Sequence, residues 1–470
     1  MSGLNAALRH ILGAGGLLDA PGDIAGYRGD LACPEGSDIL GVVRPRTTAE
    51  LAEIAKACMA AQVAMVARGG GTGLAGGATP VGDAPCVLIS FERMHRIRSI
   101  DTVGNVMIVE AGCPLQQAQA AAAEAGRLLG LDHGGAGSSQ IGGNLATNAG
   151  GNNVLRYGMA REQVLGLEAV LADGTVLSQL QPLRKNNSGY DLKQLFIGAE
   201  GTLGLITAAA LRLRPAPVRR TTACVGLSSP DAALALLARA QSLLGEAISA
   251  FELLPRAGLD LHFRHVGECR EPFEPSTPWV VLIEADSASR HFDLDAAISE
   301  VLEGAIGDGL VLAGTLAASE AQRQALWRIR EGIAVAMIET PGALKSDTSV
   351  PVAAIPDFIA QAAEAVARVA PGAVPVPFGH VGDGNIHFNV LPPPEGDLAD
   401  FRRRAPAVAR VIEDISIALG GAVSAEHGIG LLKRDALRRM RSTAELDLMR
   451  ALKRSLDPSG LLNPGKILEV

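Results

Sequence analysis

Apolar and polar positions along the first half of the chain predict strands and helices in turn. A strand-like run starts at Ile39 (ILGVV), and Thr47 with Glu50 three residues later forms the capping-box pattern of a helix start. The helix-spaced run LAEIAKACMAA follows, and VAMVA at 63–67 has the pattern of a buried strand. The sequence therefore predicts a β-α-β unit that leads straight into a glycine-rich loop at Arg68.

Further apolar runs and a change in composition divide the rest of the chain. Strands are predicted at 86–90, 106–112, 167–177 and 203–215. After Pro215, alanine-rich amphipathic helices alternate with strands such as WVVLIEAD at 279–286. Because 470 residues exceed the usual span of one core, we expect an α+β protein with domains at 1–216 and 217–405 and a C-terminal segment at 406–470.

Composition and charge exclude several kinds of protein. Hydrophobic residues make up 48% and charged residues 20% of the chain, which is typical of a globular fold. A net charge of -8 with scattered arginines and lysines argues against a nucleic acid or an anionic membrane as partner. The six cysteines form no C-x-x-C pair, and no run of about 18 uncharged apolar residues exists. We therefore expect a soluble cytoplasmic protein without a membrane span or an export signal.

The first glycine-rich loop, RGGGTGLAGG at 68–77, comes directly off a predicted strand and exposes successive backbone N–H groups. Its glycines at 71, 73 and 76 match the G-x-G-x-x-G spacing of a Rossmann NAD site, with Glu92 near the place of the ribose-binding acid. A Rossmann loop opens a helix at once, however, and here Pro80 and Pro85 follow. Taken alone, this loop is equally well read as an ordinary surface turn.

A second glycine-rich loop favours ligand binding over an ordinary surface turn. Residues 134–151 contain seven glycines interleaved with Ser138, Asn144, Thr147 and Asn148, so that hydroxyls and amides alternate with bare backbone. Two such loops in one domain suit a dinucleotide pyrophosphate that is gripped from both sides. A third glycine-rich segment, GAEGTLG at 198–204, enters a strand and is placed to meet the ring system of the ligand.

The motifs RGGGTGLAGG, GSSQIGGNLATNAGGNN, LRKNNSGYDLKQLFIGAEGTLGLIT and the terminal NPGK carry a specific resemblance. Over nearly its whole length the chain resembles FAD-binding proteins of the vanillyl-alcohol oxidase type, in the FAD-linked oxidase C-terminal branch. Within that branch it is similar to D-2-hydroxyglutarate dehydrogenases, with D-lactate and glycolate dehydrogenases as near relatives. The resemblance implies a two-subdomain FAD-binding domain, an α+β substrate (cap) domain, and a C-terminal helical segment that completes the active site and the FAD contacts.

The resemblance also implies how the flavin is held. Relatives that bond it covalently carry a histidine in the first loop, where this chain has Thr72, so we expect non-covalent FAD. The implied FAD contacts are Arg68, Gly69, Gly70, Gly71, Thr72, Gly73, Leu74, Gly137, Ser138, Gly142, Gly143, Thr147, Asn148, Glu200, Gly201, Ile206 and Asn463.

A second candidate site lies near the C-terminus. PFGHVGDGNIHFN at 377–389 consists of two extended stretches around an Asp-Gly turn, a hairpin signal that brings His380 and His387 together. His387 and Asn389 then point to the same side of the strand. Two imidazoles with a carboxylate, for which Glu426 is the candidate, are a common divalent-metal set. The alternative is that these histidines are hydrogen-bonded structural residues.

The resemblance assigns the same residues to catalysis. It implies His380, His387 and Glu426 as ligands of a zinc-like ion and His427 as the base that removes the hydroxyl proton. A chelated α-hydroxy carboxylate has a lowered hydroxyl pKa, and its α-hydrogen leaves as hydride to the flavin. The expected reaction is oxidation of a D-2-hydroxy acid to the 2-oxo acid.

The resemblance places Arg330, Lys345, Asn389 and His427 at the substrate, with arginine suited to a carboxylate. A surface salt bridge, for instance from Arg330 to Glu331, carries equal weight on the residues alone. Ala334 stands where D-2-hydroxyglutarate dehydrogenases have threonine, which leaves D-malate and D-lactate open as substrates beside D-2-hydroxyglutarate.

Two further readings stay open: a D-lactate or glycolate dehydrogenase of the same fold, and a non-catalytic flavin- or nucleotide-binding protein with a structural metal. The expected partners are the hydroxy acid and an electron acceptor, either an electron-transfer flavoprotein, a quinone or a cytochrome. A homodimer is also left open.

Overall fold

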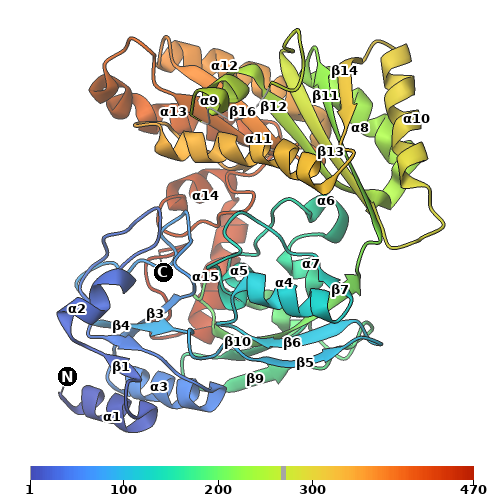
Figure 1. Ribbon diagram of the computed structural model, residues 1–470. Coiled ribbons are helices and arrows are strands. Elements are labelled where there is room, and N and C mark those ends of the chain that lie inside the picture. Colours follow the sequence, from blue (N-terminus) through green and yellow to red (C-terminus); the bar gives the residue numbers. More distant parts are fainter. Residues whose placement is uncertain (1, 266–270, 470) are drawn as a thin grey trace. The chain divides into compact units, whose positions relative to one another are not determined.

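The computed structural model describes residues 2–265 and 271–469, which form two compact units (Figure 1). The first comprises Met1–Gly151, Gly158–Ala216 and Glu426–Val470, and the second Asn152–Tyr157 and Pro217–Ala425. The chain passes from the first unit to the second between Ala216 and Pro217. The predicted segment 406–470 is not one body, because its first part continues a long helix that packs within the second unit.

The first unit contains two sheets. A four-stranded sheet has the order β1 (Leu17–Leu18), β2 (Val42–Val43), β4 (Cys86–Ser90), β3 (Ala64–Arg68). The other has the order β5 (Ile97–Asp101), β6 (Val106–Glu110), β10 (Leu205–Pro215), β8 (Val164–Val170), β9 (Val176–Gln179), with β7 (Arg127–Leu129) on β10. The helices are α1 (Ser2–Leu12), α2 (Pro21–Ile24), η1 (Ala25–Tyr27), α3 (Thr48–Ala60), α4 (Leu115–Glu124), α5 (Ile141–Ala146), α7 (Ala160–Gln163), η2 (Leu192–Leu195), α14 (Arg434–Met440) and α15 (Thr443–Leu456).

The predicted β-α-β entry to the first glycine loop is present. β2 and β3 both pair with β4 in parallel, and α3 connects them. The Thr47 side chain caps α3 by accepting from the Glu50 N–H at 3.1 Å, whereas the Glu50 carboxylate returns to the Arg46 N–H and not to that of Thr47. The strand predicted at 167–177 is wrong in one respect, because a turn at Asp173 and Gly174 splits it into β8 and β9.

The second unit is built on one seven-stranded antiparallel sheet. Its order is β14 (Val311–Leu316), β11 (Arg219–Leu227), β13 (Trp279–Ser287), β12 (Ile248–Pro255), β16 (Val374–His380), β17 (Asn385–Leu391), β15 (Thr348–Ser349). The helices are α6 (Val154–Tyr157), α8 (Pro230–Leu244), η3 (Gly245–Ala247), α9 (Arg256–His265), α10 (Leu294–Gly307), α11 (Glu320–Glu339), η4 (Val352–Ala354), α12 (Ile355–Val369) and α13 (Leu398–Ala418).

The two faces of this sheet differ in character because strand residues alternate between them. One face is mainly apolar and packs with α8, α10, α12 and α13 in a core that includes Phe251, Leu253 and Phe388. The other face, which packs with α9 and α11, is apolar in part, through residues such as Leu254 and Phe378. Polar residues stand among them on this second face, and they supply the site described below.

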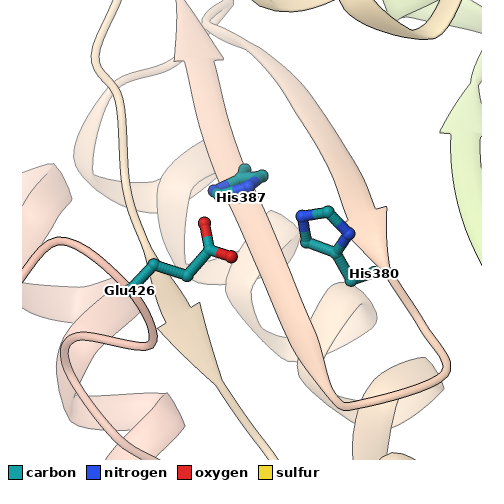
Figure 2. Close-up of side chains that lie close together, drawn as sticks. All are labelled: His380, His387 and Glu426. Atoms are coloured by element: carbon teal, nitrogen blue, oxygen red, sulfur yellow. The ribbon is translucent and has the colours of Figure 1, made fainter. Parts of the chain in front are cut away.

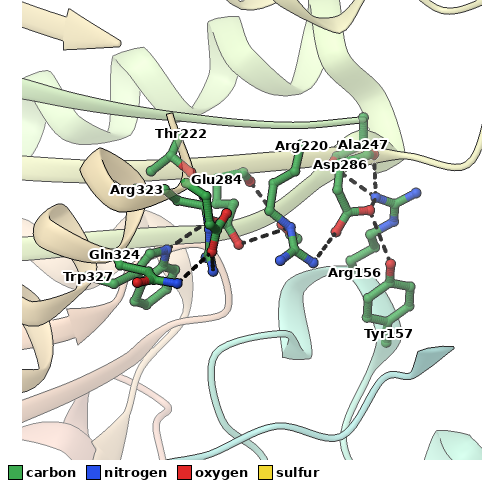
Figure 3. Close-up of polar contacts among 12 residues, drawn as sticks. Arg156, Tyr157, Arg220, Thr222, Ala247, Glu284, Asp286, Arg323, Gln324 and Trp327 are labelled. Carbon is green, nitrogen blue, oxygen red and sulfur yellow. Dashed lines mark hydrogen bonds and ion pairs between the residues drawn. The ribbon is translucent and has the colours of Figure 1, made fainter. Parts of the chain in front are cut away.

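The short helix α6 leaves the first half of the chain to join the second unit. Its Arg156 binds the Asp286 carboxylate and the Ala247 carbonyl, and Tyr157 donates to Asp286 at 3.2 Å (Figure 3). Two partners on Asp286 therefore anchor this segment on β13.

No helix among the described residues is long and apolar enough to cross a membrane. Cys33, Cys58, Cys86, Cys113 and Cys224 are free thiols, while Cys269 lies outside the described residues.

Candidate active site

The two glycine loops of the first unit pack backbone against backbone. A Cβ atom on Gly70 would lie 1.9 Å from the Ser138 carbonyl oxygen, and one on Gly142 would lie 2.6 Å from the Ala111 Cβ. Distances this short leave no room for a side chain, and at Gly70 the obstacle is backbone that cannot swing away. Gly70 is thus required by the close approach of the two loops, and Gly142 by the approach of the second loop to the end of β6.

This arrangement fits the phosphates of a dinucleotide. Within the described residues, the N–H groups of 70–73 donate no hydrogen bond to protein, although they stand in a partly buried loop. The buried Asn463 Oδ1 and Gln140 Oε1 also have no hydrogen-bond partner there. Buried polar groups are normally satisfied, so these donors and acceptors indicate a polar ligand such as FAD.

Some residues predicted to contact FAD are engaged by the protein itself. The Arg68 guanidinium binds the carbonyls of Gly26 and Gly29 and lies over the Tyr27 ring at 5.2 Å. Asn148, in the left-handed region with φ 51°, accepts from the Arg161 N–H at 2.9 Å. The remaining predicted contacts lie on the two loops, at the start of β10 or beside the terminal NPGK turn: Gly69, Gly70, Gly71, Thr72, Gly73, Leu74, Gly137, Ser138, Gly142, Gly143, Thr147, Gly201, Ile206 and Asn463.

Glu200 has a structural task that the sequence did not reveal. Its two carboxylate oxygens accept from the N–H groups of Ile429 and Gly430 at 2.7 and 2.8 Å. Its carbonyl accepts from Asn463 Nδ2 at 2.7 Å, and the same amide donates to the Gly77 carbonyl. Burial raises the pKa of Glu200 to about 7, although these N–H groups oppose the shift. Glu200 therefore holds the segment that directly follows His427.

The hairpin predicted around the Asp-Gly turn is confirmed in β16 and β17. His380 pairs with Asn385 and Phe378 with His387, so both histidines lie on the sheet face that packs with α11. Figure 2 shows the two imidazoles and the Glu426 carboxylate turned toward one another. Glu426 directly follows Ala425, the last residue of the second unit, and the three side chains offer ligand atoms that lie within 4.8 Å of one another. Such a set fits a divalent cation.

A second group of possible ligands contains Asp347, Glu426 and His427, again within 4.8 Å. Asp347 is buried and accepts from Asn385 Nδ2 and Ser424 Oγ, each at 3.2 Å. The sequence predicted a role for Lys345, two residues earlier, but not for this aspartate. Its partners Asn385 and Ser424 lie 38 and 77 residues away in the sequence, and no local pattern predicts these contacts.

The predicted substrate residues differ in their surroundings. Asn389 is buried and accepts from the Ser346 N–H at 2.9 Å, which fixes the strand beside Lys345. Lys345 itself is exposed and makes no hydrogen bond to the described residues. Asn389 therefore positions the segment that carries the lysine.

Arg330 is buried on α11, and its expected alternative pairing with Glu331 is wrong. Its Nε donates to Glu252 at 2.7 Å, and its NH2 group lies 3.2 Å from His380 Nε2. Glu252 also contacts His380 Nδ1 at 2.5 Å and is fully buried. Sequence reasoning missed Glu252, whose one signal is a lone acid within the apolar strand ISAFELLP.

Comparison with known proteins identifies the families that the two parts of the chain match. Residues 39–179 match the family model for the FAD binding domain, and residues 216–467 match that for FAD linked oxidases, C-terminal domain. A mitochondrial D-2-hydroxyglutarate dehydrogenase of Bos taurus is 41% identical over 91% of this chain and 76% of its own length. A D-2-hydroxyglutarate dehydrogenase of Xanthomonas citri pv. viticola is 37% identical over 96% of this chain and 93% of its own length.

Solved structures show the same fold at low sequence identity. p-Cresol methylhydroxylase with bound substrate matches with a TM-score of 0.78 and 16% identity over 99% of this chain and 96% of that one. An alkyldihydroxyacetonephosphate synthase matches with a TM-score of 0.75 and 17% identity over 99% and 86%. The chain is an FAD-dependent oxidoreductase that belongs to the FAD-linked oxidases and has the fold of the vanillyl-alcohol oxidase type.

Proposed function

We propose that the protein oxidises D-2-hydroxyglutarate to the 2-oxo acid with non-covalently bound FAD. The observation that carries the proposal is the buried Arg330, which lies beside His380 on the face that also bears His387. An arginine beside two imidazoles and a carboxylate suits a substrate with a carboxylate next to an alcohol. The dehydrogenases of Bos taurus and Xanthomonas citri support this choice of substrate.

The chain's own residues then have distinct tasks. Arg330 would bind the carboxylate next to the alcohol, and Lys345 the distal carboxylate. His427 would accept the hydroxyl proton, because it belongs to the group that also contains Glu426. A divalent ion, which we propose is zinc, would be held by His380, His387 and Glu426 and would supply Lewis acidity to the alcohol. FAD, when bound, supplies the hydride acceptor.

Two residues bear on the length of the substrate. Lys345 is exposed and unpaired among the described residues, so it is available to a second carboxylate. Ala334 follows Arg330 by one helical turn on α11 and offers no hydroxyl to that carboxylate. The lysine favours a dicarboxylate, while the alanine favours activity on the shorter D-malate as well.

An anaerobic titration followed at the flavin absorbance tests the proposal. We expect D-2-hydroxyglutarate to bleach the purified yellow protein, the L-enantiomer to leave it oxidised, and a chelator to slow the bleaching. Acid treatment should release the flavin, because Thr72 provides no imidazole for a covalent bond. Protein that carries no flavin, or flavin that no hydroxy acid reduces, would contradict the proposal.

The substrate assignment has its own control. Lys345→Ala should slow turnover of D-2-hydroxyglutarate far more than that of D-lactate, since only the former has a distal carboxylate. An unchanged ratio of the two rates would favour a D-lactate or glycolate dehydrogenase. Reoxidation assays with an electron-transfer flavoprotein, a quinone analogue and cytochrome c then identify the class of acceptor.

A further inference from the structure

Glu252 is a buried acid in the middle of an apolar strand. It lies on β12, directly across from His380 on β16, and its neighbours on the same face are the buried Ala250 and Leu254. Its side chain is fully buried. Taking a carboxylate out of water is costly, and a leucine in this place would pack on Leu254 without that cost. This desolvation cost indicates that the Glu252 carboxylate has a specific role.

The hydrogen bonds of Glu252 show what that role is. One oxygen faces His380 Nδ1 at 2.5 Å, and the other accepts from Arg330 Nε at 2.7 Å. A single rigid group thus touches a candidate ion ligand and the candidate substrate anchor at once. No other described acid bonds to both of these residues.

The contact also sets the chemistry of the imidazole. An ionised carboxylate only accepts hydrogen bonds, so Nδ1 of His380 carries the proton and Nε2 keeps its lone pair. That lone pair faces the Arg330 NH2 group at 3.2 Å. A carboxylate behind a histidine in this way orients the ring and raises its basicity toward a metal ion.

We propose that Glu252 is a positioning residue that aligns His380 as an ion ligand and Arg330 as a carboxylate anchor, so that ion and substrate binding depend on one side chain. The proposal rests on the function proposed above. It predicts that a change at Glu252 weakens both kinds of binding together, although Glu252 touches neither ligand.

Glu284 provides a matched control in the same sheet. It is also a buried acid that contacts α11, where it accepts from Trp327 Nε1 at 2.8 Å and from Arg323 at 3.1 Å (Figure 3). Its further partners are Thr222 and Arg220, and none of these four residues is a candidate ligand or substrate residue. Glu284→Gln therefore removes a buried charge beneath the same helix without touching His380 or Arg330.

The decisive experiment compares Glu252→Gln with Glu284→Gln. A glutamine has one acceptor and one donor group in place of two acceptors, so it retains either the His380 or the Arg330 contact but not both. Cobalt(II) titration of metal-free protein, followed by visible absorption, should show affinity reduced about 10- to 100-fold in Glu252→Gln and unchanged in Glu284→Gln. Flavin content, measured in parallel, should be equal in both variants and report intact folding.

Substrate binding gives the second readout. Glu252→Gln and Arg330→Met should each raise the KM for D-2-hydroxyglutarate, and the double variant should show less than the product of the two effects, because both act through one contact. Multiplicative effects, or cobalt affinity equal in Glu252→Gln and wild type, would overturn the inference. If Glu252→Gln loses its flavin, the same measurements are made on Glu252→Asp. Wild-type protein that binds no cobalt would instead overturn the metal site of the proposed function.

Discussion

Two buried glutamates, one in each unit, show how differently the same side chain behaves. Glu200 and Glu252 are 7% and 0% exposed, and each accepts hydrogen bonds through both oxygens. Burial raises the pKa of Glu200 to about 7, since its partners are neutral backbone N–H groups. Burial alone would also raise the pKa of Glu252, but His380 and Arg330 outweigh it and lower the pKa to about 2. The kind of partner decides the outcome: backbone N–H groups leave the pKa of Glu200 raised, whereas an imidazole and a guanidinium lower that of Glu252.

The difference extends to the regions around the two residues. The first unit presents its ligand site through backbone, with glycines where two loops approach closely and N–H groups as donors. The second unit presents its site through side chains that stand at alternate positions on one sheet face, beneath the charged residues of α11. The site of the first unit thus depends on glycines that lack side chains, and the site of the second unit on side chains that bond to one another.

Removal of the cation beside Glu252 should have the largest effect. Arg330→Met leaves the fully buried Glu252 carboxylate with His380 as its hydrogen-bond partner, and breaking a buried ion pair in this way costs about 3–5 kcal/mol. We expect a lower Tm together with a large rise in KM for D-2-hydroxyglutarate. Arg323→Met serves as control, because Arg323 pairs with Glu284 and lies away from the candidate ligands. An equal fall in Tm and an equal rise in KM in both variants would contradict the distinction.

A substitution in the glycine loops tests the backbone-built region. Gly70→Ala places a Cβ atom 1.9 Å from the Ser138 carbonyl, so one loop must shift, at about 1–3 kcal/mol or more. We expect loss of FAD affinity in equilibrium dialysis. Gly134→Ala is the control, since a Cβ atom there meets nothing within 4 Å. FAD affinity that is preserved in Gly70→Ala would show that the two loops do not need their present spacing.

The raised pKa of Glu200 predicts a pH-dependent stability. Between its ordinary value of 4.5 and about 7, the folded chain holds the proton more tightly than the unfolded chain, so this contribution is present at low pH and is lost as pH rises through 7. Lys433 and Lys466 are the cations that oppose the shift. Each pKa unit corresponds to about 1.4 kcal/mol, so the total is on the order of 3 kcal/mol.

Glu200→Gln isolates that contribution. At pH 5 the protonated Glu200 carboxyl has, like the amide of the variant, one carbonyl acceptor for the N–H groups of Ile429 and Gly430, so the two proteins should have a similar Tm. Because glutamine does not titrate, wild type alone loses stability as pH rises through 7, and the variant should have the higher Tm at pH 8. Thermal unfolding of both proteins from pH 5 to pH 8, with and without FAD, measures this difference in Tm. A difference that stays constant across this range would show that Glu200 titrates at its ordinary pKa.

The same contrast explains what the sequence could and could not predict. The glycine loops and the β16–β17 hairpin were predicted correctly, because a glycine run and an Asp-Gly turn are local signals. Glu252 and Asp347 were missed, because their roles come from partners far along the chain, such as His380 at a separation of 128 residues. The contact of Arg68 with FAD stays a prediction, and the sequence did not predict that its guanidinium binds the carbonyls of Gly26 and Gly29, about 40 residues earlier.

The smallest expected effect concerns substrate length within the side-chain-built region. Ala334→Thr adds a hydroxyl one turn beyond Arg330, at a half-buried position on α11. A neutral hydrogen bond contributes about 1 kcal/mol, so the variant should lower the KM for D-2-hydroxyglutarate roughly fivefold and leave that for D-malate almost unchanged. Ala334→Val matches the shape without the hydroxyl and is the control. If valine improves the KM as much as threonine, packing against Ile333 and its neighbours, and not a polar contact, selects the substrate; if neither variant changes it, the distal carboxylate does not reach this turn of α11.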